Sequence, residues 1–248
     1  MTRGSIVAAS VTGAATLGGV VWMFVRRRKR EPVENEKVVT LPRHLLKDAA
    51  DMAARAFVAS PAYVYLAGEN DVFALLSWVF YRNFWLRANT SCNRAVLRKG
   101  ELVAFFMFVR PEIRDVNFFD MLIAGLLKIP FLFGSDTVQR LFKLTEWFDG
   151  ITDEIRKDYP GPMCRLERVC VRPDCQGQGI GSKALQSALD EADEEGMCVC
   201  LTTQLERNVT FYERLGFEVI KVAQSDAYPK PDISMLRRPK SKNALKTD

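Results

Sequence analysis

The chain has little of what a metal enzyme or a disulfide-bonded protein needs. Its 248 residues include a single histidine, His44, and six cysteines without any CxxC spacing. A zinc site usually combines several cysteines and histidines at short spacings, so no metal site is expected. A disulfide framework is typical of shorter secreted chains and is not expected at this length. His44 falls in a helical pattern, which favours a surface or capping residue over a catalyst.

The cysteines are better explained as small apolar residues. Cys198 and Cys200 alternate along a predicted strand, where cysteine packs as a small hydrophobe. Cys175 lies beside a glycine-rich turn and is expected to be the more exposed thiol, a bystander rather than a nucleophile.

A basic surface is also absent outside the first thirty residues. The formal net charge is +5, but residues 1–30 hold six Lys or Arg and no acid, which leaves 29 bases against 30 acids in the remainder. A nucleic-acid-binding domain usually carries an excess of bases, so we expect no nucleic-acid partner.

Charged residues are missing altogether from Ser5 to Val25. As a helix this run would extend roughly 30 Å, enough to cross a bilayer core. The basic cluster Arg26 to Arg30 follows, and bases on this side favour a cytosolic location. We therefore expect residues 1–30 to form a membrane anchor with a basic flank, in a single-pass protein whose domain faces the cytosol. A cleaved or organellar presequence and a soluble helix are the alternatives, and the sequence does not indicate which membrane.

A linker at 31–37 precedes a domain expected at 38–239, followed by a polar tail at 240–248. Hydrophobic periodicity predicts strands at 38–41, 94–98, 102–109, 166–171, 197–203, 217–223 and 233–237, and helices at 42–57, 71–86, 136–159, 180–196 and 208–215. The later strand–helix–strand order requires parallel neighbours, whereas the hairpin signal Lys99-Gly100 requires antiparallel ones. We expect an α/β domain with a mixed, mostly antiparallel sheet and helices on both faces.

Two apolar stretches have more than one interpretation. Phe118 to Phe133 is short for a membrane span and contains Asp120, Lys128 and Pro130, so a buried amphipathic helix is the better prediction. The aromatic-rich helix at 71–86 is expected to pack in the core, with the lining of an apolar substrate pocket as the alternative.

The sequence Gln176-Gly177-Gln178-Gly179-Ile180-Gly181 joins a predicted strand to a predicted helix. Glycines lack Cβ atoms and let an anion approach the backbone closely. The first turn of a helix offers unpaired N–H groups and a partial positive charge. This pattern predicts an anion site, with a plain tight turn as the alternative.

Two spaced motifs resemble those of the GNAT superfamily of N-acetyltransferases. Val171-x-Pro173 followed by Gln176-x-x-Gly179-x-Gly181 is similar to the superfamily's acetyl-CoA motif. Asn208-x-x-x-Tyr212-x-x-x-Gly216-Phe217 is similar to its second signature, in the right order. The resemblance covers residues 38–239 and is strong over 163–219. The segment 54–61 resembles the subgroup that includes small-molecule and antibiotic acetyltransferases.

The resemblance implies an N-acetyltransferase that moves an acetyl group from acetyl-CoA to a primary amine by direct attack in a ternary complex. It implies a small-molecule acceptor, acetyl-CoA as co-substrate, and no metal. The alternative is a catalytically weak acyl-CoA-binding module, or a membrane-tethered interaction module, on the same fold.

The resemblance also assigns the cofactor-binding residues. Strand backbone would pair with the pantetheine arm, the turn and the first helical amides would hold the pyrophosphate, and Asn208 would bond the pantetheine or nearby backbone. These residues are Val169, Cys170, Val171, Gln176, Gly177, Gln178, Gly179, Ile180, Gly181, Ser182 and Asn208.

Two residues receive catalytic roles from the resemblance. Tyr212 would be the general acid for the departing thiolate, and Glu167 would take the amine proton through water. Strand alternation should put Glu167 on one face and both Leu166 and Arg168 on the other. An ion pair between Glu167 and Arg168 or Arg165 is the alternative, and some members of the superfamily use no side-chain base.

Overall fold

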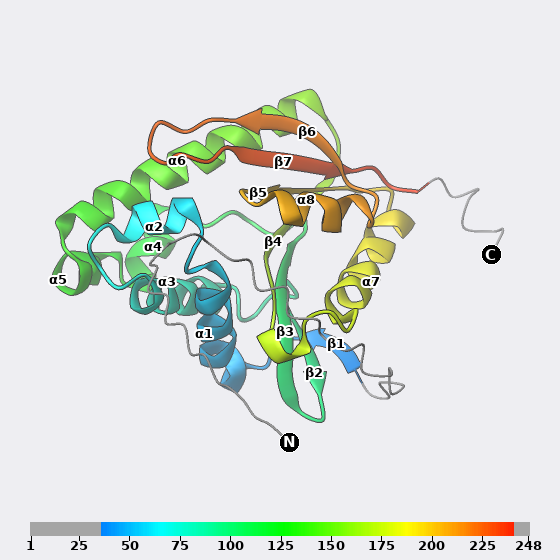
Figure 1. Ribbon diagram of the computed structural model, residues 1–248, viewed down its shortest axis with the longest axis horizontal. Helices are drawn as coiled ribbons and strands as arrows, with labels where there is room; N and C mark the ends of the chain where they lie inside the picture. The colour runs from blue at the N-terminus through cyan, green and yellow to red at the C-terminus, as the bar shows by residue number, and fades with distance from the viewer. Residues whose placement is uncertain (1–35, 241–248) are drawn as a thin grey trace, which may run out of the picture. The chain divides into compact units, whose positions relative to one another are not determined.

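The computed structural model describes residues 36–240 (Figure 1), and these residues form one mixed sheet with helices packed against it. The strands are β1 (Glu36–Thr40), β2 (Asn93–Arg98), β3 (Glu101–Val109), β4 (Met163–Val171), β5 (Cys198–Thr203), β6 (Glu218–Ala223) and β7 (Asp232–Arg237). The helices are α1 (Leu46–Phe57), α2 (Pro61–Ala67), α3 (Val72–Leu86), α4 (Phe118–Ala124), α5 (Ile129–Phe133), α6 (Ser135–Asp158), α7 (Ile180–Glu194) and α8 (Glu206–Glu213), with 3-10 turns η1 (Arg43–Leu45), η2 (Leu126–Lys128) and η3 (Pro173–Cys175).

The sheet runs in the order β1-β2-β3-β4-β5-β7-β6. The β4–β5 pair is parallel and the other pairs are antiparallel. Helix α7 provides the crossover that a parallel pair requires. The prediction of a mixed, mostly antiparallel sheet is therefore confirmed.

The two faces of the sheet carry separate hydrophobic cores. Along β3, Phe105 and Met107 pack with α1, α2 and α3, whereas Phe106 and Phe108 pack with α7. This is the period-two alternation of a strand buried on both faces. Figure 1 shows α1 to α3 on one side of the central strands and α7 on the other. The long helix α6 packs on β4, β5 and β7 through Ile151 and Ile155.

Strands β4 and β5 separate partway along their length. Their parallel ladder runs from Met163 opposite Cys198 to Arg165 opposite Cys200 and then stops. Beyond that point β4 stays paired with β3, and β5 stays paired with β7. The facing edges of the two strands therefore have no strand partner among the described residues, and a gap opens in the middle of the sheet.

A β-bulge lies where the gap begins. The β3–β4 register pairs Met107 with Glu167 but Phe105 with Cys170, so β4 holds an extra residue there. Arg168 has a φ of 51°, in the left-handed region that a non-glycine residue rarely adopts. The expected alternation is wrong at this point, because the bulge puts Glu167 and Arg168 on the α3 face while Leu166 packs on the α7 face.

A buried ion pair fixes the far end of α7. Arg237 of β7 donates two hydrogen bonds to Asp193, at 2.7 and 2.6 Å, and both side chains are almost completely buried. Arg237 also donates to the Leu215 carbonyl. Burial alone would raise the pKa of Asp193, but the guanidinium outweighs it and lowers that pKa. Removing one partner of such a pair costs about 3–5 kcal/mol, so α7 is firmly held.

The segment between β3 and β4 corrects a prediction. Residues 118–133 do not form one buried helix: Gly125, with a φ of 102°, ends α4, and a 3-10 turn leads to α5. Only Ala124, Leu126 and Ile129 are buried. Composition could not reveal that the remaining apolar side chains face outward.

The predicted anchor at 5–25 lies outside the described residues, as does most of the polar tail at 240–248. Among residues 36–240, no helix combines the length and the apolar character that a membrane crossing requires.

Candidate active site

The glycine turn lies directly after β4 and opens helix α7. Gln176, Gly177, Gln178 and Gly179 are all exposed, whereas Ile180 is 2% exposed and fixes the start of the helix in the core. Gly179 is the N-cap residue, and no side chain caps this helix end. The first N–H groups of a helix have no partner within it, so the amides from Ile180 to Ser182 are free to hold an anion.

Two glutamines hold the turn in shape. Gln176 donates a 3.0 Å hydrogen bond to the Val171 carbonyl at the end of β4. Gln178 donates to the Asp174 carbonyl and accepts from Arg98 of β2, at 2.9 Å in both cases. Both side chains are thus used in fastening the loop, which leaves the backbone as its anion-binding part.

The turn needs glycine for two separate reasons. Gly177 and Gly179 have φ values of 73° and 80°, where a side chain would strain the backbone. At Gly181 the reason is space, because a Cβ would lie 3.3 Å from the Val171 side chain. Neither Gly177 nor Gly179 has an atom within 4 Å of the position a Cβ would take, so their outer side is open.

Tyr212 lies beside the gap between β4 and β5. It is 8% exposed and packs edge-on against Phe211 and Phe217, at 5.1 and 5.6 Å between ring centroids. Burial raises the pKa of its hydroxyl above the ordinary value near 10, with a smaller contribution from Cys170 of β4. The hydroxyl therefore keeps its proton at neutral pH.

The other predicted cofactor residues also border the gap. Val169 and Val171 are half-buried on the α7 face, and Cys170 is buried on the opposite face. Burial raises the pKa of the Cys170 thiol to about 12, so this thiol is not a nucleophile. Asn208 donates a 2.9 Å hydrogen bond to the Thr203 hydroxyl and so joins α8 to the end of β5.

Cys175 and His44 lie outside this arrangement. Cys175 is 2% exposed, so the expectation of a more exposed thiol is wrong: its side chain packs under the turn with the α7 core. His44 is an exposed residue of η1. Among residues 36–240 no group of three or more His, Cys, Asp or Glu is placed to bind a metal ion.

Glu167 is surrounded by arginines. Its carboxylate accepts from Arg168 at 2.5 Å and from Arg165 at 3.2 Å. Burial would raise the pKa of Glu167, but Arg168, Arg165 and Arg87 together lower it. The ion pairing that was the alternative to a base is thus present, and it makes this carboxylate a weak proton acceptor.

A second polar cluster, which the sequence patterns did not reveal, lies on the same face. Asp232 is fully buried, and no cation of residues 36–240 pairs with it. Three neutral donors hold its carboxylate: Trp147 Nε1 at 2.8 Å, Tyr228 Oη at 2.6 Å and Gln204 Nε2 at 2.9 Å. Gln204 in turn accepts from Ser60 at 2.7 Å. The cluster therefore ties α6, the β6–β7 loop, the end of β5 and the start of α2 together.

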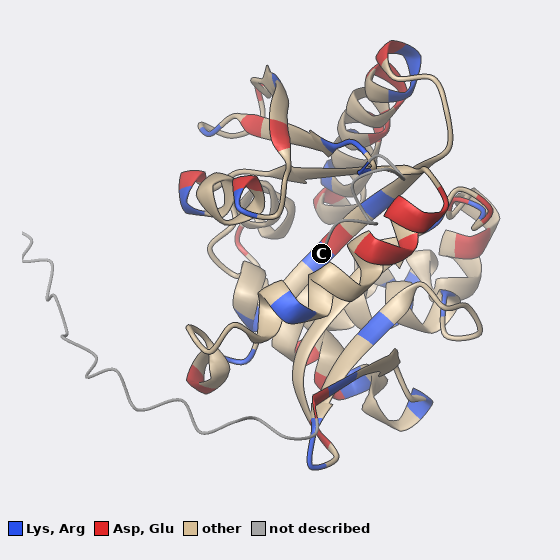
Figure 2. Ribbon diagram, turned by 90° about the vertical axis from the view of Figure 1, so that its right-hand side faces the viewer, with Lys and Arg blue, Asp and Glu red and all other residues tan. Residues whose placement is uncertain are grey.

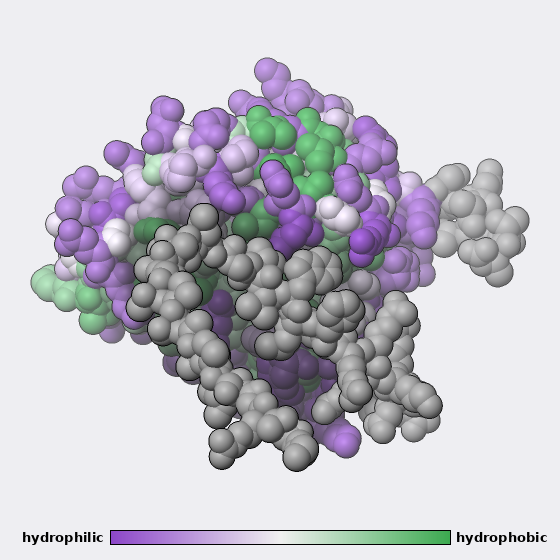
Figure 3. Space-filling view, viewed as in Figure 1, coloured by the Kyte–Doolittle hydropathy of each residue, from purple (hydrophilic) through white to green (hydrophobic). Residues whose placement is uncertain are grey.

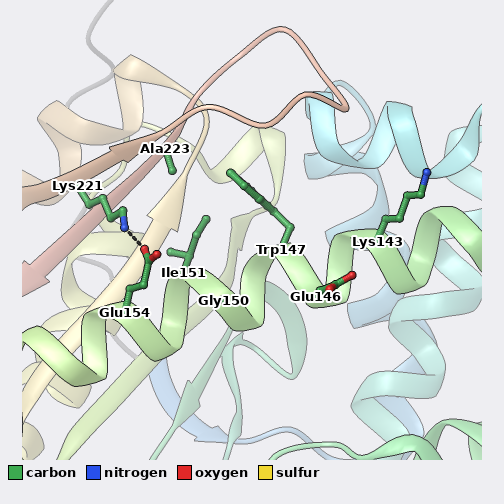
Figure 4. A pocket seen from close by; sticks show the side chains of 8 residues that line it. All are labelled: Lys143, Glu146, Trp147, Gly150, Ile151, Glu154, Lys221 and Ala223. Atoms are coloured by element: carbon green, nitrogen blue, oxygen red, sulfur yellow. Dashed lines mark ion pairs between the residues drawn. The ribbon is translucent and has the colours of Figure 1, made fainter.

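An open pocket of about 440 Å³ lies elsewhere, between α6 and β6 (Figure 4). Charged residues line much of it, including Lys143, Glu146 and the ion-paired Glu154 and Lys221. None of the predicted site residues borders it. Elsewhere, acidic and basic residues are interspersed over the described part of the chain (Figure 2).

Comparison with known proteins agrees with this geometry. Residues 147–219 match the family model described as the acetyltransferase (GNAT) domain. A solved structure from Corynebacterium glutamicum, described as histone acetyltransferase HPA2 and related acetyltransferase, is 18% identical with a TM-score of 0.59, covering 84% of this chain and 98% of that one. Mosquito arylalkylamine N-acetyltransferase like 5b is 10% identical, with a TM-score of 0.59 and coverage of 82% and 100%.

An apo variant of agmatine N-acetyltransferase is 13% identical, with a TM-score of 0.53 and coverage of 83% of this chain and 100% of that one. Identities this low establish the fold and not the substrate. The chain therefore has the α/β GNAT fold, and residues 147–219 carry the sequence pattern of a GNAT acetyltransferase domain.

The charge balance at Glu167 can be measured. Replacing Arg168 with Gln removes the nearest cation, so the pKa of the Glu167 carboxyl rises, because the remaining arginines offset less of the cost of burial. A carboxyl-detected NMR titration measures this shift.

Arg172→Gln is the matched control, because Arg172 pairs with Asp174 and Glu101 and not with Glu167. If Glu167 titrates at the same pH in wild type and Arg168→Gln, the arginine does not set its charge.

Proposed function

We propose that the protein is an N-acetyltransferase that moves the acetyl group of acetyl-CoA to a primary amine. One observation carries the proposal: the uncapped start of α7 lies against Val171 of β4 and Phe211 of α8 at Gly181, and the buried Tyr212 packs on Phe211 close to Cys170 of β4, beside the gap between β4 and β5. Together they offer an anion site, a slot for an extended chain and a proton donor.

The pyrophosphate of acetyl-CoA would lie at the start of α7. Amides of residues 177–182 and the helix dipole would hold the negative charge there. The open space outside Gly177 and Gly179 supports this placement, because oxygen atoms can reach the backbone without meeting a side chain.

The pantetheine arm would run into the gap in the sheet. Backbone groups of Val169 to Val171 face β5 without a strand partner, and an amide-containing chain can pair with them like an added strand. The arm would lead the thioester from the glycine turn towards Tyr212.

Acetyl transfer then needs two proton movements. The amine nitrogen attacks the thioester carbonyl, the C–S bond breaks, and the thiolate takes the proton of Tyr212. The raised pKa of this hydroxyl keeps it protonated until the thiolate forms, and a thiolate in the same buried setting is itself more basic than in water.

The second proton leaves the attacking amine. Glu167, on the α3 face beside the gap, is our candidate to accept it through water. Because its pKa is lowered, it is a weak base, and the amine would have to bind largely in its neutral form.

The acceptor is proposed to be a small primary amine. Arg165 and Arg168 already pair with Glu167, and Arg165 also pairs with Asp115. These paired carboxylates have little capacity to attract a polycation, which favours a singly charged or neutral acceptor.

Gly179→Glu tests the anion site. A carboxylate on the open side of the turn repels pyrophosphate, and the φ of 80° adds backbone strain, so the dissociation constant for acetyl-CoA rises roughly 100-fold. Isothermal titration calorimetry measures the constant.

Gly196→Glu, at the other end of α7, is the matched control, because Gly196 also has a positive φ, of 69°, and open space around it. It should leave affinity within about twofold. If both variants weaken acetyl-CoA binding equally, the loss reflects general destabilisation, and the anion-site assignment is contradicted.

Tyr212→Phe tests the proton donor. The ring still packs on Phe211 and Phe217, so acetyl-CoA affinity changes by less than about twofold while kcat falls roughly 100-fold. Thiol release from acetyl-CoA with a panel of amines gives the rate.

Tyr159→Phe, at the end of α6 beneath Arg238, serves as control and should leave kcat unchanged. A similar loss of affinity and of kcat in Tyr212→Phe would argue against the acid role. Binding of acetyl-CoA without turnover on any amine would favour the acyl-CoA-binding or tethered interaction module instead.

We further propose that residues 5–25 anchor the protein in a membrane with the domain on the cytosolic side. The uncharged run and the basic cluster at 26–30 support this. The full chain should stay with membranes through carbonate extraction, and a chain carrying Val11→Asp and Val20→Asp should be released. Release of the unmodified chain would contradict the anchor.

A further inference from the structure

Large apolar side chains project from the segment α4–η2–α5. Phe131 is 90% exposed, Phe119 71% and Leu127 69%. With their neighbours they form what we call the apolar tip: Phe118, Phe119, Ile123, Leu127, Phe131 and Leu132. Figure 3 shows apolar surface at the edge of the molecule where Figure 1 places α5. Full burial of a large apolar side chain contributes about 1.5–3 kcal/mol. A contiguous group of such side chains left in water therefore indicates a surface that binds a partner.

The backbone beneath the tip is firmly held. Asn117 and Asp120 form a reciprocal capping box at the start of α4, with hydrogen bonds of 3.0 and 2.8 Å. Ala124, Leu126 and Ile129 pack inward. The outward direction of the apolar side chains is therefore fixed by the fold and is not the result of a loosely attached loop.

The tip carries little charge, and what it carries is positive. Asp120 is neutralised by Arg114 through two hydrogen bonds, at 2.7 and 2.9 Å. Lys128 is exposed between Leu127 and Ile129. Apolar side chains beside a long cationic one match the boundary between acyl chains and anionic headgroups, where lysine extends its charge toward the phosphates.

The chain outside the described residues indicates what covers the tip. The uncharged run 5–25 and the five bases at 26–30 end only five residues before β1 begins at Glu36. Five extended residues reach at most roughly 17 Å. An inserted anchor would keep the domain tethered to a lipid surface, so an apolar segment that the fold exposes would meet lipid at a high effective concentration.

We propose that the apolar tip is a second membrane-contact site, which inserts into the interface of a lipid bilayer that contains anionic lipids. The site rests on the proposed anchor but is independent of acetyl transfer. A second copy of the chain is the alternative occupant, and the experiment below distinguishes it from a bilayer. Lys128 and the bases at 26–30 all favour anionic headgroups.

The test uses the full chain bound to vesicles of phosphatidylcholine and phosphatidylserine whose acyl chains carry bromine near the headgroup. Bromine quenches tryptophan only at close range. Phe131→Trp adds a reporter at the tip, and Val222→Trp adds one at an exposed apolar position of β6 outside it. The emission added at 131 should fall at least twofold on brominated vesicles, and the emission added at 222 should not change.

A second variant removes the apolar character of the tip. In Phe131→Trp with Leu127→Glu and Ile123→Glu, the quenching at 131 should disappear while the chain still floats with the vesicles. Acetyl transfer to a soluble amine, measured in parallel, should be the same in all these chains, so a failure of the tip is separable from a failure of the enzyme proposal.

Three results would overturn the proposal. If the emission at 131 is unquenched in a chain that floats, the anchor proposal stands and the apolar tip does not contact the bilayer. If the unmodified chain does not float, both the anchor and the membrane-contact site are contradicted. A lipid-free dimer that Leu127→Glu abolishes would assign the tip to a second copy.

Discussion

The arrangement of the site depends on one constraint, the end of the β4–β5 ladder after Arg165 and Cys200. Because each strand keeps its other neighbour, the sheet stays intact while its centre opens. The bulge at Arg168 turns two consecutive polar side chains to the same face at the start of the gap, and the glycine turn closes its other end. The gap that we propose as the pantetheine slot thus follows from where one row of hydrogen bonds stops.

The polar groups on the α3 face differ in how they are neutralised. Glu167 is ion-paired with Arg165 and Arg168, whereas Asp232 accepts from three neutral donors and has no cationic partner in the described part of the chain. The first arrangement weakens a base, and the second joins four separate segments. This contrast explains why Glu167 is a weak proton acceptor, while the Asp232 cluster gives the face a fixed shape.

The sequence was informative where backbone chemistry leaves a local pattern. Glycines at 177, 179 and 181 and the periodicity of the strands predicted the turn, α7 and the mixed sheet, which the structure confirms. It was uninformative where pairing or exposure decides. The positive φ of Arg168 could not be predicted, since arginine rarely adopts one. The composition of 118–133 could not distinguish a buried helix from an exposed one. The Asp232 cluster joins segments far apart in the chain, so no spacing could reveal it.

An interrupted ladder also has a consequence for the lifetime of the protein in a cell. If the slot holds the pantetheine arm as proposed, the coenzyme supplies hydrogen bonds that the polypeptide lacks, and it acts as a removable strand. A ligand present at 100 times its dissociation constant stabilises the folded state by about 2.7 kcal/mol. The unfolded fraction open to proteases, and with it the abundance of the protein, would then follow the metabolic supply of acetyl-CoA.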